Sequence, residues 1–104
     1  MKIYGIKTCD TCRKAIKAFP DAEFVDVRAD GLPDDVRDAA LAAFGDALLN
    51  TRSTTWRGLS DAERAGTPVN LLAQHPTLMK RPLIDANGRL TLGWTAAVQA
   101  ELGL

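Results

Sequence analysis

The chain has 104 residues, of which 46% are hydrophobic and 25% charged, and its 13 basic residues balance its 13 acidic ones. This length predicts a single domain over residues 1–104. No apolar stretch approaches the roughly 18–20 residues of a membrane span, and the first residues lack a signal-peptide pattern. The 2 cysteines are too few for the disulfide framework of a small secreted protein. We therefore expect a monomeric cytoplasmic protein with no membrane partner, and the neutral balance argues against direct nucleic-acid binding.

Charge is unevenly distributed along the chain. Residues 21–46 carry eight acidic side chains against two basic ones, so this segment has a net charge of −6 and the remainder +6. One interpretation is a solvated surface of mixed charge; the other is a basic site for a small anion or a thiolate, flanked by acidic surface. Eight of the 13 basic residues lie in three clusters, which are Lys7, Arg13, Lys14 and Lys17, then Arg52 and Arg57, then Lys80 and Arg81.

The N-terminal third has the pattern of a strand, a helix and a second strand. Residues 2–6 alternate as a short strand does, and residues 23–28 form a second apolar run. Between them, apolar residues recur at helical spacing, and Pro20 ends the helix. Thr8, Asp10 and Thr11 are all residue types that favour the N-cap position. A strand, helix and strand in so few residues predict two parallel strands joined by a crossover helix.

The middle of the chain predicts helices alone. A helix begins near Pro33 and ends at Gly45, and a shorter one follows at residues 47–49. After a hydroxyl-rich loop over residues 50–55, we expect one or two helical turns at residues 60–65. A further helix opens at Thr67-Pro68 and stops before His75-Pro76. The expected buried stripe of the first helix is Val36, Ala39, Ala40, Ala43 and Phe44.

The C-terminal third predicts a hairpin and a last helix. A strand that begins with residues 83–84 and a strand over residues 90–92 flank Asn87-Gly88, which is typical of a primed two-residue turn. Trp94, Val98 and Leu102 then recur at helical spacing. The order of elements predicts an α/β protein with a thioredoxin-like fold, in which a small mixed four-stranded sheet carries a helical insertion.

The segment Cys9-Asp10-Thr11-Cys12 lies where the first strand gives way to the first helix. A C-x-x-C at that junction is typical of a redox motif, because the helix N-terminus offers N–H groups and partial positive charge to a thiolate. An ordinary thiol is only a few per cent ionised at neutral pH; lowering its pKa by roughly two units, about 2.7 kcal/mol, makes the thiolate the major form. Cys9, just outside the helix, is the exposed candidate nucleophile, and Cys12 is either a resolving thiol or a buried core residue.

Other chemistry has weaker support in the sequence. A zinc site needs about four ligands, and the chain offers only two cysteines and His75 besides carboxylates, so we expect no bound metal. His75 is better explained as a helix-end residue than as a catalytic base, and Trp56 and Trp94 as packing residues. Arg52 and Arg57 could line a cleft with the hydroxyls around them, or could be ordinary surface charges.

Lys80-Arg81-Pro82 precedes the third strand, at the position where thioredoxin-like folds place a cis-proline facing the redox cysteine. Either isomer of the Arg81–Pro82 bond is accessible, because cis lies only about 0.5–1 kcal/mol above trans before proline. A guanidinium beside this bend would point toward the cysteine loop and pair with a thiolate, a carboxylate or an oxyanion.

Three separated motifs, at residues 4–15, 47–57 and 75–83, resemble the arsenate reductase (ArsC) superfamily over essentially the whole chain. The YffB-like branch is the most similar, followed by the Spx-type regulators. The resemblance implies the thioredoxin-like ArsC fold, with Cys9 matching the nucleophile and Arg81-Pro82 matching the family's arginine and cis-proline. Of the three arginines that hold the oxyanion in arsenate reductases, only Arg81 matches.

The other two arginine positions differ. One corresponds to Asn50, with Arg52 two residues on as a spatial substitute, and the other falls near Gly93. We expect Cys9, Cys12 and Arg81 to be catalytic. The residues expected to contact the substrate are Thr8, Asp10, Thr11, Arg13, Arg52 and Pro82.

The leading functional hypothesis is a thiol oxidoreductase that acts on a small thiol or oxyanion substrate, arsenate among them. Its partner would be glutathione or glutaredoxin, with glutathione as co-substrate and no bound cofactor. Cys9 would form a covalent adduct that glutathione or Cys12 then resolves. The alternative is an Spx-like redox-sensing regulator that binds RNA polymerase, with Cys9 and Cys12 as the switch.

Overall fold

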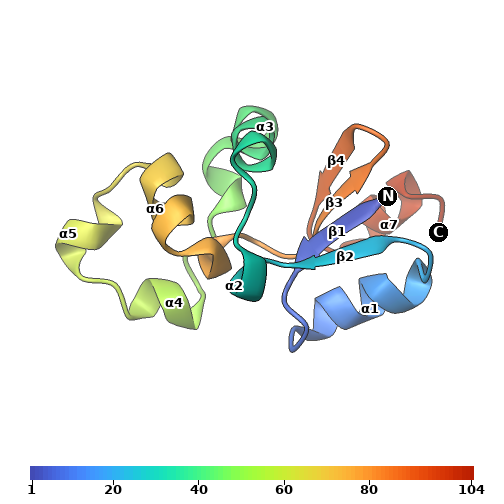
Figure 1. The fold of residues 1–104 in the computed structure, drawn as a ribbon, viewed down its shortest axis with the longest axis horizontal. Coiled ribbons are helices and arrows are strands. Elements are labelled where there is room, and N and C mark those ends of the chain that lie inside the picture. Colours follow the sequence, from blue (N-terminus) through green and yellow to red (C-terminus); the bar gives the residue numbers. More distant parts are fainter. The chain divides into compact units, whose positions relative to one another are not determined.

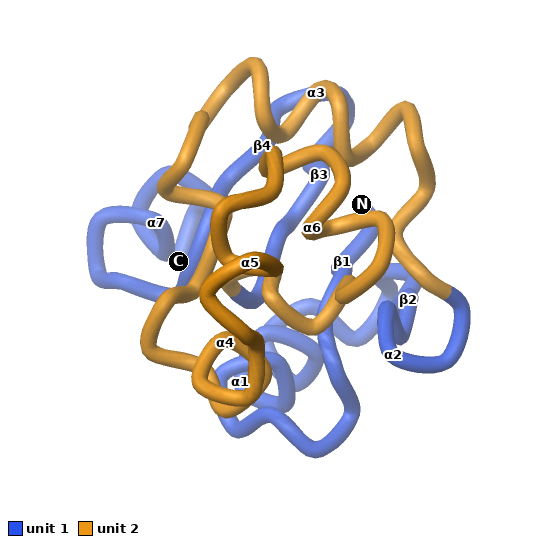
Figure 2. Tube along the Cα trace, turned by 90° about the vertical axis from the view of Figure 1, so that its left-hand side faces the viewer, with its two compact units in different colours: residues 1–30, 81–104 blue, residues 31–80 orange.

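The computed structural model describes all 104 residues, which form two compact units. The first unit combines Met1–Asp30 with Arg81–Leu104, and the second is the intervening segment Gly31–Lys80 (Figure 2). The predicted helical insertion therefore forms the second unit, and in the sequence it lies between the two segments of the first unit. No helix in the chain is both long and apolar enough to cross a bilayer.

The first unit is built on a four-stranded sheet with the order β2-β1-β3-β4 (Figure 1). β1 pairs in parallel with β2 and antiparallel with β3, and β3 pairs antiparallel with β4. Both turn residues between β3 and β4 have positive φ, Asn87 at 55° and Gly88 at 91°, as a primed turn requires. The predicted mixed sheet and its hairpin are confirmed. The strands are β1 Lys2–Gly5, β2 Glu23–Asp26, β3 Leu83–Ala86 and β4 Arg89–Leu92.

The strand register brings distant parts of the chain to the same end of the two central strands, β1 and β3. Tyr4 lies opposite Leu83 in the antiparallel pair of β1 and β3. The chain that leaves β1 toward Cys9 therefore runs beside the chain that enters β3 through Arg81 and Pro82. A motif near the N-terminus and a motif more than seventy residues later thus meet because of strand pairing.

Two helices complete the first unit, α1 (Asp10–Ala18) and α7 (Ala96–Glu101). Ile3 and Ile84 pair across β1 and β3, and both pack with Ala15 of α1 in a fully buried cluster. Half-buried side chains surround this cluster, among them Trp94, whose ring meets that of Phe19 edge-on at 6.3 Å. The interpretation of Trp94 as a packing residue is confirmed.

Two predicted boundaries in the first unit are wrong, and local capping explains both. The second strand stops at Asp26, because the Asp26 carboxylate accepts the Arg28 N–H at 2.9 Å and starts the short helix α2 (Val27–Asp30). Trp94 lies outside the last helix, because the Thr95 hydroxyl accepts the Val98 N–H at 3.2 Å and sets the N-cap there.

The second unit consists of short helices, as expected. Side-chain hydroxyls of Ser53, Ser60 and Thr67 cap three of them, and Ser60 forms a reciprocal capping box with Glu63. His75 ends α6, as predicted, and its Nε2 lies 3.5 Å from Glu63 Oε2. The helices are α3 Asp34–Phe44, η1 Gly45–Leu48, α4 Thr54–Arg57, α5 Asp61–Arg64, α6 Pro68–Gln74 and η2 Pro76–Leu78.

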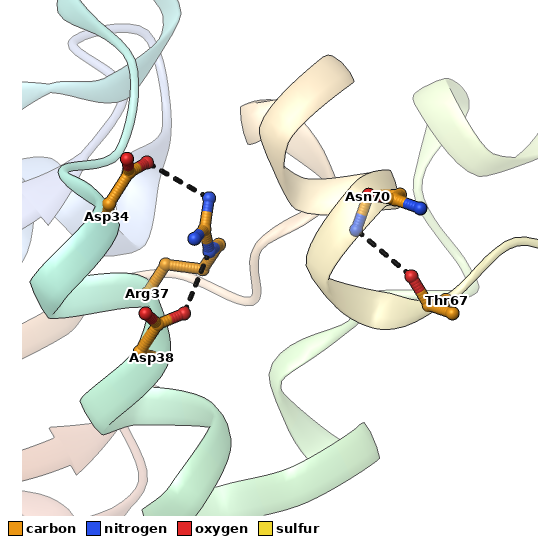
Figure 3. A network of polar contacts seen from close by, with 5 residues as sticks. All are labelled: Asp34, Arg37, Asp38, Thr67 and Asn70. Atoms are coloured by element: carbon orange, nitrogen blue, oxygen red, sulfur yellow. Dashed lines mark hydrogen bonds and ion pairs between the residues drawn. The ribbon is translucent and has the colours of Figure 1, made fainter.

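The buried face of α3 differs from the predicted stripe. Ala40 is buried, but Ala39 and Ala43 are exposed. Arg37 lies on the covered face instead, with 12% of its side chain exposed, and it donates to Asp34 at 3.0 Å and to Asp38 at 3.1 Å (Figure 3). The prediction was wrong because it admitted only apolar residues, whereas an arginine covers surface with its alkyl stem once carboxylates pair its charge.

A glycine in β1 allows α1 to pack closely on the sheet. A Cβ atom at Gly5 would collide with Cys12 Sγ and would lie 3.3 Å from Cys12 Cβ. Gly5 has no positive φ, so it serves to leave space rather than to make a turn. The buried position of Cys12 therefore depends on the missing side chain of Gly5.

We predict that Gly5→Ala lowers the free energy of unfolding by about 1–3 kcal/mol, because the added methyl overpacks the contact between β1 and α1. Denaturant unfolding measures the change. Gly58→Ala is the matched control, since that position has negative φ and a Cβ there meets only ordinary contacts at 3.6 Å.

The same prediction has a double-variant test. In Gly5→Ala/Cys12→Ala the sulfur that the methyl would strike is gone, so the combined loss of stability should be smaller than the sum of the two single losses. Additive losses, or a Gly5→Ala variant as stable as Gly58→Ala, would refute the account.

Candidate functional site

Cys9 is the N-cap residue of α1. Its backbone is extended, with φ −84° and ψ 124°, and its carbonyl accepts the Arg13 N–H at 3.0 Å. A turn closed by the Cys9 N–H and the Ile6 carbonyl, also 3.0 Å apart, leads from β1 into this position. The expectation of an oxygen-bearing N-cap among the neighbours of Cys9 is wrong, because no side-chain oxygen caps α1. The cysteine itself stands where helix N–H groups lack partners.

The surroundings of Cys9 favour its ionised form. Partial burial raises the pKa of the thiol, but the Thr11 hydroxyl, the backbone N–H and thiol of Cys12, and the charge of Arg81 outweigh burial and lower the pKa to about 7. Thr11 Oγ1 lies 3.1 Å from Cys9 Sγ, within hydrogen-bond distance for sulfur. The half-buried Cys9 Sγ thus combines access with stabilising donors.

Cys12 has the opposite environment. It is fully buried in the first turn of α1, as its place on the apolar face predicts. Burial raises the pKa of its thiol, and the nearby Cys9 raises it further, to about 12, against the lowering effects of the Ile6 backbone and Arg81. Cys12 is therefore a neutral thiol near pH 7, able to donate its S–H to the Cys9 thiolate.

Arg81 and Pro82 immediately precede β3, at the end of the sheet from which the chain also leaves β1 toward Cys9. Arg81 is half-buried, and its charge lowers the pKa of both cysteines. The Arg81–Pro82 peptide bond is cis, an isomer that the sequence left open. Pro82 is buried, and its carbonyl accepts the Gly93 N–H at 2.9 Å.

The remaining predicted residues of the first unit, Thr8, Asp10 and Arg13, flank Cys9 in the sequence. Thr8 and Asp10 are exposed, Thr8 in the turn and Asp10 in the first turn of α1. Arg13 is exposed, and its Nε donates to the Lys7 carbonyl at 3.0 Å. This hydrogen bond connects α1 to the loop that precedes Cys9.

Arg52 belongs to the second unit, where it is exposed. Its backbone N–H donates to Asn50 Oδ1 at 3.1 Å, and it lines a cavity together with Lys80. Two hydroxyls of the neighbouring loop have structural partners: that of Ser53 caps α4, and that of Thr55 pairs with Thr77 at 2.8 Å. No group of three or more His, Cys, Asp or Glu side chains is placed to hold a metal ion.

Sequence reasoning missed Gly5 as a part of this site. Its signal was a glycine inside a strand pattern, which often marks a close approach of another segment. The signal does not say which segment approaches, and Cys12 is identified only by the structure.

Several known proteins are similar to this chain in sequence or in structure. An uncharacterized protein of Haemophilus influenzae is 41% identical over 101 residues, covering 88% of this chain and 89% of that protein. The structure of the YFFB (PA3664) protein superposes with a TM-score of 0.85 at 29% identity, over 96% of both chains. The structure of an arsenate reductase (ArsC) related protein from Brucella melitensis gives 0.70 at 33% identity, over 99% of this chain and 94% of that one.

The sheet order and the helix that follows Cys9 indicate the same fold as these similarities do. The model of the ArsC family matches residues 4–101, which is nearly the whole chain. The chain therefore belongs to the ArsC family and has its thioredoxin-like fold.

Proposed function

We propose that the protein is an ArsC-like thiol oxidoreductase in which Cys9 is the nucleophile. The observation that carries this proposal is the position of Cys9 at the start of α1, with Thr11, Cys12 and Arg81 lowering its pKa to about 7. About half of the Cys9 side chains are then thiolates at neutral pH, and the thiolate is the form that attacks. Membership of the ArsC family supports the same class of chemistry.

The reaction that this arrangement supports is thiol–disulfide exchange. The Cys9 thiolate attacks one sulfur of a disulfide, forming a mixed disulfide with it and releasing the other sulfur as a thiolate. A glutathione thiolate then attacks the substrate sulfur of the mixed disulfide, and Cys9 leaves as a thiolate. A low pKa also makes Cys9 a good leaving group in this second step.

We propose glutathione, directly or through glutaredoxin, as the resolving thiol in preference to Cys12. Burial is the largest cause of the raised pKa of Cys12, and burial persists after Cys9 has been oxidised. The effects of the Cys9 charge disappear at that point, but a buried thiol remains a poor source of thiolate. The role that fits Cys12 is donation of its S–H to the Cys9 thiolate, which stabilises the nucleophile.

An oxyanion such as arsenate is a second substrate class for the same nucleophile. The charge of Arg81 lowers the pKa of Cys9, and a guanidinium can hold an oxyanion through two parallel hydrogen bonds. The similar structure from Brucella melitensis is described as that of an arsenate reductase (ArsC) related protein. Arsenate therefore belongs in the substrate panel beside small mixed disulfides.

We predict that Cys9→Ser lowers glutathione-dependent reduction of a small mixed disulfide by more than about 1,000-fold, because a serine hydroxyl remains protonated at neutral pH. Cys12→Ser is the matched variant. It should keep activity within about tenfold of wild type, since an external thiol resolves the intermediate. Steady-state assays with glutathione as donor, and arsenate in a parallel arm, measure both.

Equal activity of Cys9→Ser and wild type would reject the nucleophile. Loss of activity in Cys12→Ser comparable to that in Cys9→Ser, with the mixed disulfide trapped on Cys9, would instead assign the resolving role to Cys12.

The pH dependence of alkylation provides a further prediction. The rate of Cys9 labelling by iodoacetamide should reach half of its plateau near pH 7, because only the thiolate reacts and its fraction falls as the pH drops below the pKa. Cys12 labelling should stay slow throughout the range, since its pKa is about 12 and its side chain is buried. Mass spectrometry of the two cysteines separates their rates.

Variants of the neighbours should move this midpoint upward. Arg81→Gln removes a charge that favours the thiolate, and Thr11→Val removes a hydrogen-bond donor, so each raises the pKa of Cys9. Arg89→Gln, an exposed change on the β3–β4 hairpin, is the control that removes the same charge elsewhere. A midpoint shared by all four proteins would show that these neighbours do not set the acidity of Cys9.

A further inference from the structure

We propose that Arg13 is a positioning residue for the nucleophile, because it fixes the loop that precedes Cys9, in place of the substrate contact that the sequence suggests. This inference rests on the proposed function of Cys9. Arg13 makes two hydrogen bonds to this part of the chain: its Nε donates to the Lys7 carbonyl and its backbone N–H donates to the Cys9 carbonyl, both at 3.0 Å. One residue of α1 thus holds the chain at Cys9 and two residues before it.

The loop between β1 and α1 is a turn with an exposed middle. The Cys9 N–H donates to the Ile6 carbonyl at 3.0 Å and closes the turn. Ile6 is buried, but Lys7 and Thr8 are exposed, so packing against the core does not hold the middle of the turn. The hydrogen bond from Arg13 ties this exposed middle to α1. It therefore limits the movement of the turn relative to the helix.

The position of Cys9 relative to α1 matters because groups that favour its thiolate belong to that helix. Thr11 Oγ1 lies 3.1 Å from Cys9 Sγ, and Thr11 and Cys12 both lower the pKa of Cys9. Cys9 itself stands outside the helix, at its N-cap. Hydrogen bonds weaken steeply when their distance or angle departs from the optimum. A looser turn therefore leaves the Cys9 thiolate less stable and less often in the reactive geometry.

The Arg13 side chain is oriented by the loop and not by a carboxylate. Arg13 takes part in none of the ion pairs, although Asp10 lies three residues before it on α1, a spacing at which opposite charges often pair. The side chain instead turns toward the N-terminal end of the helix, which is the direction in which helical side chains lean. Its hydrogen bond to the Lys7 carbonyl therefore uses the ordinary geometry of a residue in a first helical turn.

Three substitutions separate the hydrogen bond of Arg13 from its charge. In Arg13→Gln the side-chain nitrogen is bonded to Cδ, as Nε is in arginine, so a donor remains at this position and the charge is lost. In Arg13→Met both are absent. In Arg13→Lys the charge remains, but a carbon atom replaces Nε. A positioning role predicts rescue by glutamine, whereas a substrate-binding role predicts rescue by lysine.

The test is a single turnover of the reduced protein with two disulfide reagents, of which dipyridyl disulfide is neutral and dithiobis(nitrobenzoate) carries two carboxylates. The Cys9 thiolate attacks one sulfur, the S–S bond of the reagent breaks, a mixed disulfide forms, and the other half leaves as a thiolate whose release is followed by absorbance. We expect Arg13→Met to slow both reactions equally, by about three- to tenfold, which is the contribution of one hydrogen bond. Arg13→Gln should restore most of the rate with both reagents.

Two further readouts do not depend on a disulfide. The midpoint of Cys9 labelling by iodoacetamide should lie at a higher pH in Arg13→Met than in Arg13→Gln. The Cys9 backbone N–H, which is bonded to the Ile6 carbonyl, should exchange with solvent faster in Arg13→Met. A contribution to stability alone would lower the free energy of unfolding and leave the labelling midpoint unchanged, so denaturant unfolding of each variant accompanies the test.

Lys14→Met is the matched control, because it removes one charge from the next residue of α1, which is also exposed. It should stay within about twofold of wild type with both reagents at fixed ionic strength. Equal rates for Arg13→Gln and Arg13→Met, or a loss that is confined to the charged reagent and restored by Arg13→Lys, would overturn the positioning role. So would a loss in Lys14→Met equal to that in Arg13→Met.

Failure of this inference differs from failure of the proposed function. If Arg13→Gln and Arg13→Met behave alike while Cys9→Ser is inactive, Arg13 has no positioning role and Cys9 remains the nucleophile. If Cys9→Ser is as active as wild type in glutathione-dependent reduction, the proposed function fails, whereas the labelling and exchange measurements still test the effect of Arg13 on the turn.

Discussion

The account rests on the balance of forces at one sulfur atom. Burial beside α1 opposes ionisation of Cys9, whereas Thr11, Cys12 and Arg81 favour it, and the favourable effects win. The hydrogen-bond donors come from the first turn of the helix that Cys9 itself begins. The cation comes from the far end of the sequence, through the pairing of β1 with β3. Local helix geometry and sheet topology must therefore both be correct for the thiolate to form.

Much of the fold could be predicted from the sequence because short-range signals agreed with the tertiary structure. The strand β1, the Asn87-Gly88 turn and the Thr67-Pro68 helix start all appear in the structure, although β1 buries Ile3 and Tyr4 in succession and does not alternate. The errors occurred where a polar side chain decided the outcome. Asp26 ended β2 by capping a helix turn, and Arg37 covered the face of α3 that alanines were expected to bury. Hydrophobic periodicity cannot detect such polar interactions.

The site was only partly predictable, for a physical reason. Cys9 and Cys12 follow from their spacing at a strand–helix junction, and the difference between them follows from the helix face on which each lies. Gly5 could not be connected with Cys12, because the contact depends on the exact packing of α1 on the sheet. The Arg81–Pro82 isomer likewise follows from the three-dimensional structure, since proline allows both forms.

The most direct test of the central claim is an NMR titration of the protein labelled with ¹³Cβ-cysteine, because the Cβ shift reports the ionisation of each sulfur separately. The account predicts that the Cys9 signal titrates with a midpoint near pH 7, while the Cys12 signal stays at its thiol position to well above pH 9. A Cys9 midpoint near the ordinary cysteine value of about 8.5 would contradict it, because the neighbours of Cys9 would then have no net effect on its charge.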